Sequence, residues 1–175
     1  MRSISRDEGR AMELDTMITR RGWLAAGLKT ALAGAVLSAL VPGLAAAESK
    51  PVSITVYKDP SCGCCTKWVT HLASNGFKPI ARDRSDMDAL KDSLGVPSAL
   101  RSCHTAVLGK FVIEGHVPAA DVKRLIASAP KGVLGLAVPG MPSGSPGMEV
   151  PGQADRYDVV AFTAGGKTRV FATHG

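Results

Sequence analysis

The chain has 175 residues, a formal net charge of +6 at pH 7 and aromatic side chains at only 5% of its positions. The basic residues are scattered rather than clustered, and few aromatic residues accompany them. Such a pattern is typical of a solvated surface, so it argues against nucleic acid as a partner.

The first 47 residues predict an export signal rather than part of the fold. Arg20 and Arg21 stand before a moderately apolar stretch, 23–41, and small residues lead to an expected cleavage site near Ala47. The paired arginines resemble a twin-arginine signal, and an ordinary secretory signal is the alternative. Cleavage would leave 48–175 as one periplasmic domain without stable membrane insertion, because the apolar stretch is barely long enough to span a bilayer.

The cleaved chain should begin with a buried β-strand at Val52–Tyr57, whose residues alternate and are partly β-branched. A turn at 59–61 follows, and a helix is expected to begin near Cys62. Asn75-Gly76 ends this helix. The apolar stripe at helical spacing consists of Cys65, Trp68, Val69 and Leu72.

Further strands and helices continue the alternation. The expected strands are 77–81, 105–108 and 111–114, and the expected helices are 86–94 and 118–129. The predicted fold class is therefore α/β, and the order β-α-β-α-β-β-α resembles the thioredoxin or glutaredoxin fold.

A Pro/Gly-rich segment, 130–152, offers little to form regular structure and is expected to fold over the cysteine-rich end of the domain. A C-terminal β-hairpin is expected at 157–163 and 167–173.

In a thioredoxin-like arrangement, several chemically active residues meet at one end of the sheet. A right-handed parallel crossover puts the first two strands side by side, and the third strand runs antiparallel to the first. The residues expected to converge on the first strand-to-helix junction are Cys103, His104, Glu114 and His116. Because side chains alternate along a strand, Cys103 and His104 are expected to point to opposite faces.

Three cysteines occur within four residues at that junction, Cys62-Gly63-Cys64-Cys65. Thiolates are soft ligands and strong nucleophiles, so the cluster suits Cu(I) or thiol–disulfide exchange. Crowded thiolates repel one another, and a soft monovalent cation would relieve that repulsion. Structural disulfides are a third interpretation, since all four cysteines follow the export signal.

Other residues could complete a metal site. Cys103 is the favoured candidate for a fourth sulfur ligand, and the alternative is a small buried hydrophobic residue. His116 could reach the site or lie in a solvated loop. Met141 and Met148 could supply thioethers or only pack within the Pro/Gly-rich segment.

Together, the Cys-x-Cys-Cys motif, Cys103-His104 and the segments 112–119 and 135–142 resemble the bacterial domain-of-unknown-function family that contains the copper-resistance protein CopG. The resemblance implies a periplasmic thioredoxin-like domain that binds copper, as a small cluster, with a role in copper resistance and a proposed Cu(I)/Cu(II) redox activity. The copper ligands it implies by position are Cys62, Cys64, Cys65 and Cys103.

The sequence thus predicts a protein that holds Cu(I), in a mononuclear or multinuclear site, for copper resistance or homeostasis. Copper ions are the expected partners, together with other periplasmic copper-handling proteins. The alternative is a thiol–disulfide oxidoreductase, and the sequence does not decide whether the protein turns over a substrate.

Overall fold

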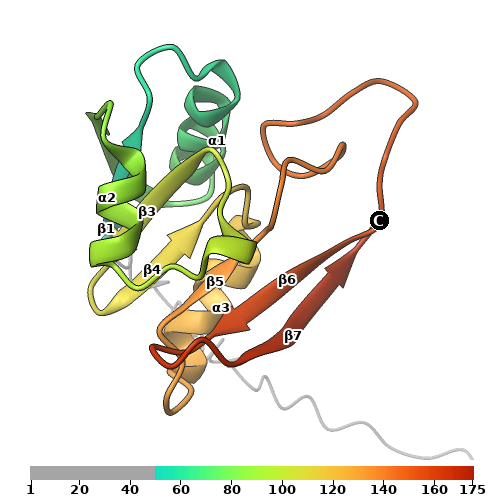
Figure 1. Ribbon diagram of the computed structural model, residues 1–175. Helices are drawn as coiled ribbons and strands as arrows, with labels where there is room; N and C mark the ends of the chain where they lie inside the picture. The colour runs from blue at the N-terminus through green and yellow to red at the C-terminus, as the bar shows by residue number, and fades with distance from the viewer. Residues whose placement is uncertain (1–49) are drawn as a thin grey trace, which may run out of the picture. The chain divides into compact units, whose positions relative to one another are not determined.

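A seven-stranded sheet organises residues 50–175, the part of the chain that the computed structural model describes (Figure 1). The strands are β1 (Val52–Lys58), β2 (Phe77–Asp83), β3 (His104–Leu108), β4 (Phe111–Glu114), β5 (Gly135–Ala137), β6 (Tyr157–Phe162) and β7 (Thr168–His174). The helices are α1 (Gly63–Ser74), α2 (Met87–Ser93), the short 3-10 helix η1 (Ser98–Leu100) and α3 (Ala119–Ser128). The predicted export signal, 1–47, lies outside the described residues.

The predicted element order is confirmed through α3, as is the α/β class. Strand β1 pairs with β2 in parallel and with β3 antiparallel, and β4 returns antiparallel to β3. The C-terminal hairpin is also confirmed, as β6 and β7. The narrower assignment to the thioredoxin-like fold stays a prediction. Within residues 50–175, no helix is both long and apolar enough to cross a bilayer.

The sheet has an apolar layer on each face, which follows from the alternation of side chains along a strand. In β4, Phe111 and Ile113 pack with α1 and α3, whereas Val112 packs with the region of α2 and η1. On the first face, α1 contributes Trp68, whose indole Nε1 donates a hydrogen bond of 2.9 Å to the carbonyl oxygen of Val117. Helix α1 is thereby fixed against the segment that follows β4.

Strand β5 was not expected, because the Pro/Gly-rich segment showed no strand pattern. Its three residues pair in parallel with β4 and antiparallel with β6. A Cβ atom at Gly135 would lie 1.9 Å from the carbonyl oxygen of Val112, so the pairing depends on the missing side chain. The prediction of little regular structure over 130–152 is therefore wrong at 135–137, where β5 joins the C-terminal hairpin to the rest of the sheet.

Candidate metal centre

The N-terminus of α1 carries three of the cysteines. Cys62 is the N-cap residue, and its sulfur accepts a hydrogen bond of 3.3 Å from the backbone N–H of Cys65. Cys62 and Cys65 form a disulfide, whereas Cys64 and Cys103 are free thiols. A helix N-terminus favours negative charge, so this position suits a thiolate when the disulfide is open.

Cys103 joins this cluster from the residue that precedes β3. Its sulfur lies 3.9 Å from that of Cys64, which in turn lies 3.5 Å from that of Cys62. The four sulfur atoms all lie within 4.8 Å of one another. The predicted convergence of Cys103 with the Cys-x-Cys-Cys motif is confirmed as geometry, and the role of these four residues as metal ligands stays a prediction.

His116 presents one ring nitrogen to the cluster. Its Nε2 lies 3.1 Å from the sulfur of Cys103, and its Nδ1 donates a hydrogen bond of 2.8 Å to the carbonyl oxygen of Pro146. A carbonyl can only accept, so the proton resides on Nδ1 and Nε2 offers a lone pair in the neutral ring. Burial lowers the pKa of His116, which favours this neutral, ligand-competent form.

His104 also faces Cys103, contrary to the expectation that the two residues point apart. Its Nδ1 lies 3.3 Å from the sulfur of Cys103, and its ring packs 4.4 Å from that of Trp68 between centroids. The expectation failed because β3 begins at His104, so Cys103 lies outside the regular alternation. The side chain of His104 is fully buried, its Nε2 has no hydrogen-bond partner among residues 50–175, and burial holds its pKa well below the usual value.

Burial also governs the charge of Cys103. Burial of Cys103, followed by the negative charge that Cys64 would carry, raises the pKa of Cys103 to about 12. Cys103 is therefore a protonated thiol at neutral pH in the metal-free chain. Metal ligation requires the thiolate, so a soft cation would bind there with release of this proton.

A buried ionic network holds the backbone on which Cys103 stands. Glu114, which is fully buried, accepts hydrogen bonds from the backbone N–H of Ser102 (2.7 Å) and from the hydroxyl of Thr105 (2.6 Å). It also forms an ion pair with Lys91, whose ammonium group donates to the carbonyl oxygen of Ser102 (3.0 Å). Glu114 was expected at this end of the sheet, but no sequence pattern singled out Lys91, whose partners lie on other elements.

The Pro/Gly-rich segment lies over the cysteine cluster, as predicted. Besides the contact of Pro146 with His116, the carbonyl oxygen of Gly140 accepts a hydrogen bond from the hydroxyl of Ser102. Gly147 has a positive φ of +87°, and a Cβ atom there would lie 2.9 Å from the carbonyl oxygen of Cys64. Only glycine combines this backbone conformation with so close an approach.

Comparison with known proteins identifies the family of this chain. Residues 100–148 match the family described as "Protein of unknown function, DUF411". Two solved structures, named copper resistance protein CopG forms 2 and 1, are 46% and 47% identical to the chain with a TM-score of 0.68 each. Both cover 71% of this chain, which spans 99% and 98% of theirs. The chain belongs to the DUF411 family, together with CopG. A search of curated proteins finds no match.

In this DUF411 chain, the two methionines of the Pro/Gly-rich segment occupy different surroundings. Met141 is 53% exposed, and its assignment as a ligand stays a prediction. Met148 is half-buried and lines an open cavity of about 330 Å³ together with Cys64, Lys67 and Glu149. Met148 is therefore placed beside the cluster, whereas the sequence left open, for both methionines, whether they supply a ligand or only pack within the segment.

Proposed function

We propose that the protein is a periplasmic copper-binding protein that holds Cu(I) for copper resistance or homeostasis. Copper is its cargo, and the ligands are the thiolates of Cys62, Cys64, Cys65 and Cys103, with the imidazole of His116 beside them. The observation that carries the proposal is the approach of all four sulfur atoms to within 4.8 Å of one another. The similarity of the chain to two structures named copper resistance protein also supports the proposal.

Copper suits this donor set better than harder divalent metals do. Soft thiolate ligands favour Cu(I), and sulfur atoms this close can bridge more than one Cu(I) ion. Cu(I) would also displace the proton that burial keeps on Cys103 in the absence of metal, and would neutralise the thiolate that forms. Periplasmic residence follows from the proposed export signal, with cleavage near Ala47.

The disulfide between Cys62 and Cys65 adds a redox state to the site. A dithiol reductant that supplies two electrons and two protons, and is itself oxidised to a disulfide, would open it to two thiols, which makes four sulfur ligands available. In the reverse direction, the two thiols lose two electrons and two protons, and two Cu(II) ions each gain one electron. Imidazole nitrogen eases capture of Cu(II), so His116 would assist that Cu(II)-to-Cu(I) conversion. Cys64 and Cys103 would remain reduced and would bind the Cu(I) that forms as thiolates, with release of their protons.

The same disulfide favours a second candidate function, a thiol–disulfide oxidoreductase. Cys62 and Cys65 have the C-x-x-C spacing of such enzymes and stand at a helix N-terminus, which lowers thiol pKa values in general. This function needs neither Cys64 nor Cys103. It predicts turnover of a disulfide substrate without metal.

Equilibrium dialysis against Cu(I) under anaerobic conditions tests the proposal. The reduced wild type should retain more Cu(I) per chain than reduced Cys64→Ser, and more than the wild type with its Cys62–Cys65 disulfide intact. Thr70→Ser, an exposed change on α1 away from the sulfur atoms, serves as the control and should match the wild type. Equal stoichiometry in wild type and Cys64→Ser contradicts the proposal. Copper-independent reduction of oxidised glutathione by both proteins would instead favour the oxidoreductase.

A further inference from the structure

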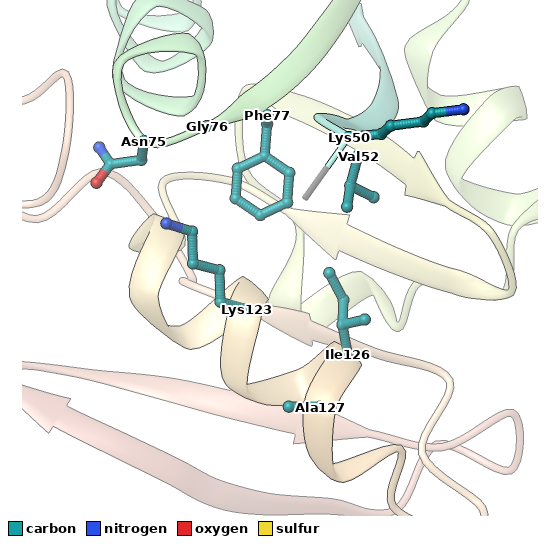
Figure 2. Close-up of a pocket in the computed structure, with 8 residues that line it drawn as sticks. All are labelled: Lys50, Val52, Asn75, Gly76, Phe77, Lys123, Ile126 and Ala127. Carbon is teal, nitrogen blue, oxygen red and sulfur yellow. The ribbon is translucent and has the colours of Figure 1, made fainter. Parts of the chain in front are cut away.

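A groove opens at the end of the sheet opposite to the thiols, around the first residues of β1. It consists of two adjoining cavities of about 430 and 260 Å³, which share Val52 and Ile126 as lining residues. Figure 2 shows the larger cavity, with Val52, Phe77 and Ile126 turned toward one another from β1, β2 and α3. Leu108 and Phe111 of the turn between β3 and β4 line the smaller one.

This apolar groove is unusual because part of its floor is exposed. Val52 was expected within a buried strand, yet 44% of it is accessible to solvent. Exposed apolar surface with a polar rim often marks an interaction site. The two adjoining cavities are lined from the starts of β1 and β2 to the β3–β4 turn, and such a succession of small cavities suits an extended segment.

The rim of the groove is positively charged. Lys50 lines the larger cavity, and the ammonium groups of Lys123 and Lys110 lie 6.0 and 5.1 Å from the ring centroids of Phe77 and Phe111. No carboxylate lines either cavity, and within residues 50–175 these three lysines form no ion pair. Among the other lysines of this range, Lys58 pairs with Asp83 at 2.9 Å and Lys91 pairs with Glu114, whereas four exposed lysines form no ion pair either, namely Lys67, Lys78, Lys131 and Lys167. The rim is therefore distinguished by three lysines beside apolar side chains with no carboxylate in the lining.

We propose that this lysine-rimmed groove docks an acidic, apolar segment of a partner protein. Apolar side chains of the segment would cover Val52 and Ile126, and its Asp or Glu side chains would pair with Lys110 and Lys123. Opposite charge across an interface selects the partner and speeds association. A second copy of this chain is a poor occupant of the same groove, because it would bring its own three lysines against these.

The groove and the thiols lie at opposite ends of β1. This strand has seven residues, from Val52 at the groove to Lys58 near the cysteine cluster, and strand rise separates the two ends by about 20 Å. A partner docked in the groove therefore leaves Cys64 and its cavity open. The docking function is independent of the proposed copper chemistry.

A pair of synthetic peptides tests this docking function on the full-length protein. The first is acetyl-Glu-Leu-Glu-Phe-Glu-Leu-Glu-amide with a fluorescent label, and the second has lysine in place of every glutamate. Fluorescence anisotropy should show the acidic peptide binding about tenfold tighter than the basic one, and added salt should reduce this difference. The double variant Lys110→Glu/Lys123→Glu should reverse the preference. Lys167→Glu, an exposed lysine of the β6–β7 turn, should leave it unchanged.

A second measurement locates the bound peptide. Amide signals of Val52, Phe77 and Ile126 should shift in NMR spectra on addition of the acidic peptide, and those of Cys64 should not. Equal binding of both peptides, or an unchanged preference in the double variant, overturns the proposal. So does the absence of peptide binding, which would mean that the residues before Lys50 or a second copy already fill the groove. Charge-dependent binding to phosphatidylglycerol vesicles without peptide binding would assign the surface to lipid, and also overturns it.

Discussion

The two ends of β1 reverse the usual distribution of side chains in opposite ways. Near Lys58, the molecule buries polar groups that are normally exposed, namely His104, Glu114 and His116. Near Val52, it exposes an apolar side chain beside ammonium groups that form no ion pair within residues 50–175. Buried polar groups and exposed apolar patches are the informative departures from an ordinary fold. Their separation indicates that the proposed copper binding and the proposed partner docking can be changed independently.

The largest effect should follow from removal of Cys103. Cys103→Ser removes the sulfur that lies between Cys64 and His116, so the reduced protein should lose the multi-sulfur site and with it tight Cu(I) retention. Dialysis followed by metal analysis measures this loss. Binding of the acidic peptide should be unchanged, because the groove lies at the other end of the sheet. Loss of peptide binding in this variant would break the comparison between the two ends.

The next largest effect concerns stability. Glu114→Gln leaves the ammonium group of Lys91 buried without its counter-charge, which should lower the free energy of unfolding by about 3–5 kcal/mol in urea titrations. The matched change at the groove end, Lys110→Gln, affects an exposed lysine and should cost less than about 0.5 kcal/mol. Equal losses in the two variants would show that the Lys91–Glu114 pair has no special structural role.

A change of pH should affect Cu(I) binding at the thiol end but not peptide binding in the groove. Cys103, with its pKa raised to about 12, is protonated throughout the neutral range, and ligation displaces its proton. Affinity should therefore rise with pH, by about tenfold per unit for each proton displaced. Competition against a Cu(I) chelator at pH 6 to 8 measures the slope. A flat profile would mean that Cys103 does not become a thiolate ligand, whereas peptide binding by the lysine-rimmed groove should change little over this range.

The smallest effect is expected at the imidazole beside the cluster. His116→Gln removes the lone pair that faces Cys103 and should weaken Cu(I) binding by about tenfold. His174→Gln is the control. His174 lies at the end of the C-terminal hairpin, and its Nε2 pairs instead with Asp121 of α3 at 2.6 Å. Equal affinities of wild type and His116→Gln for Cu(I) would show that the imidazole of His116 does not contribute to Cu(I) binding.

The cysteine cluster and the element order could be predicted because both leave local signals in the sequence. β-Branched runs mark β1 and β4, and the Cys-x-Cys-Cys motif stands directly at a strand-to-helix junction. Cys103 could be placed only through the strand directions, which the pairing of β1 with β3 bears out.

Other features were not predictable because they depend on contacts between distant segments. Strand β5 has only three residues, too few for a periodic pattern, and exists through the close approach of Gly135 to Val112. Lys91 resembles any surface lysine of a short helix until β4 places Glu114 against it. The exposure of Val52 in the groove could not be predicted either, because Val52 has the sequence pattern of a buried strand residue.

Copper-edge X-ray absorption on the reduced, Cu(I)-loaded full-length protein tests the central claim most directly. The account predicts a first coordination shell dominated by sulfur, with fewer sulfur neighbours per copper or less bound copper in Cys64→Ser. A shell of nitrogen and oxygen alone, or a spectrum that is identical in wild type and Cys64→Ser, would contradict it.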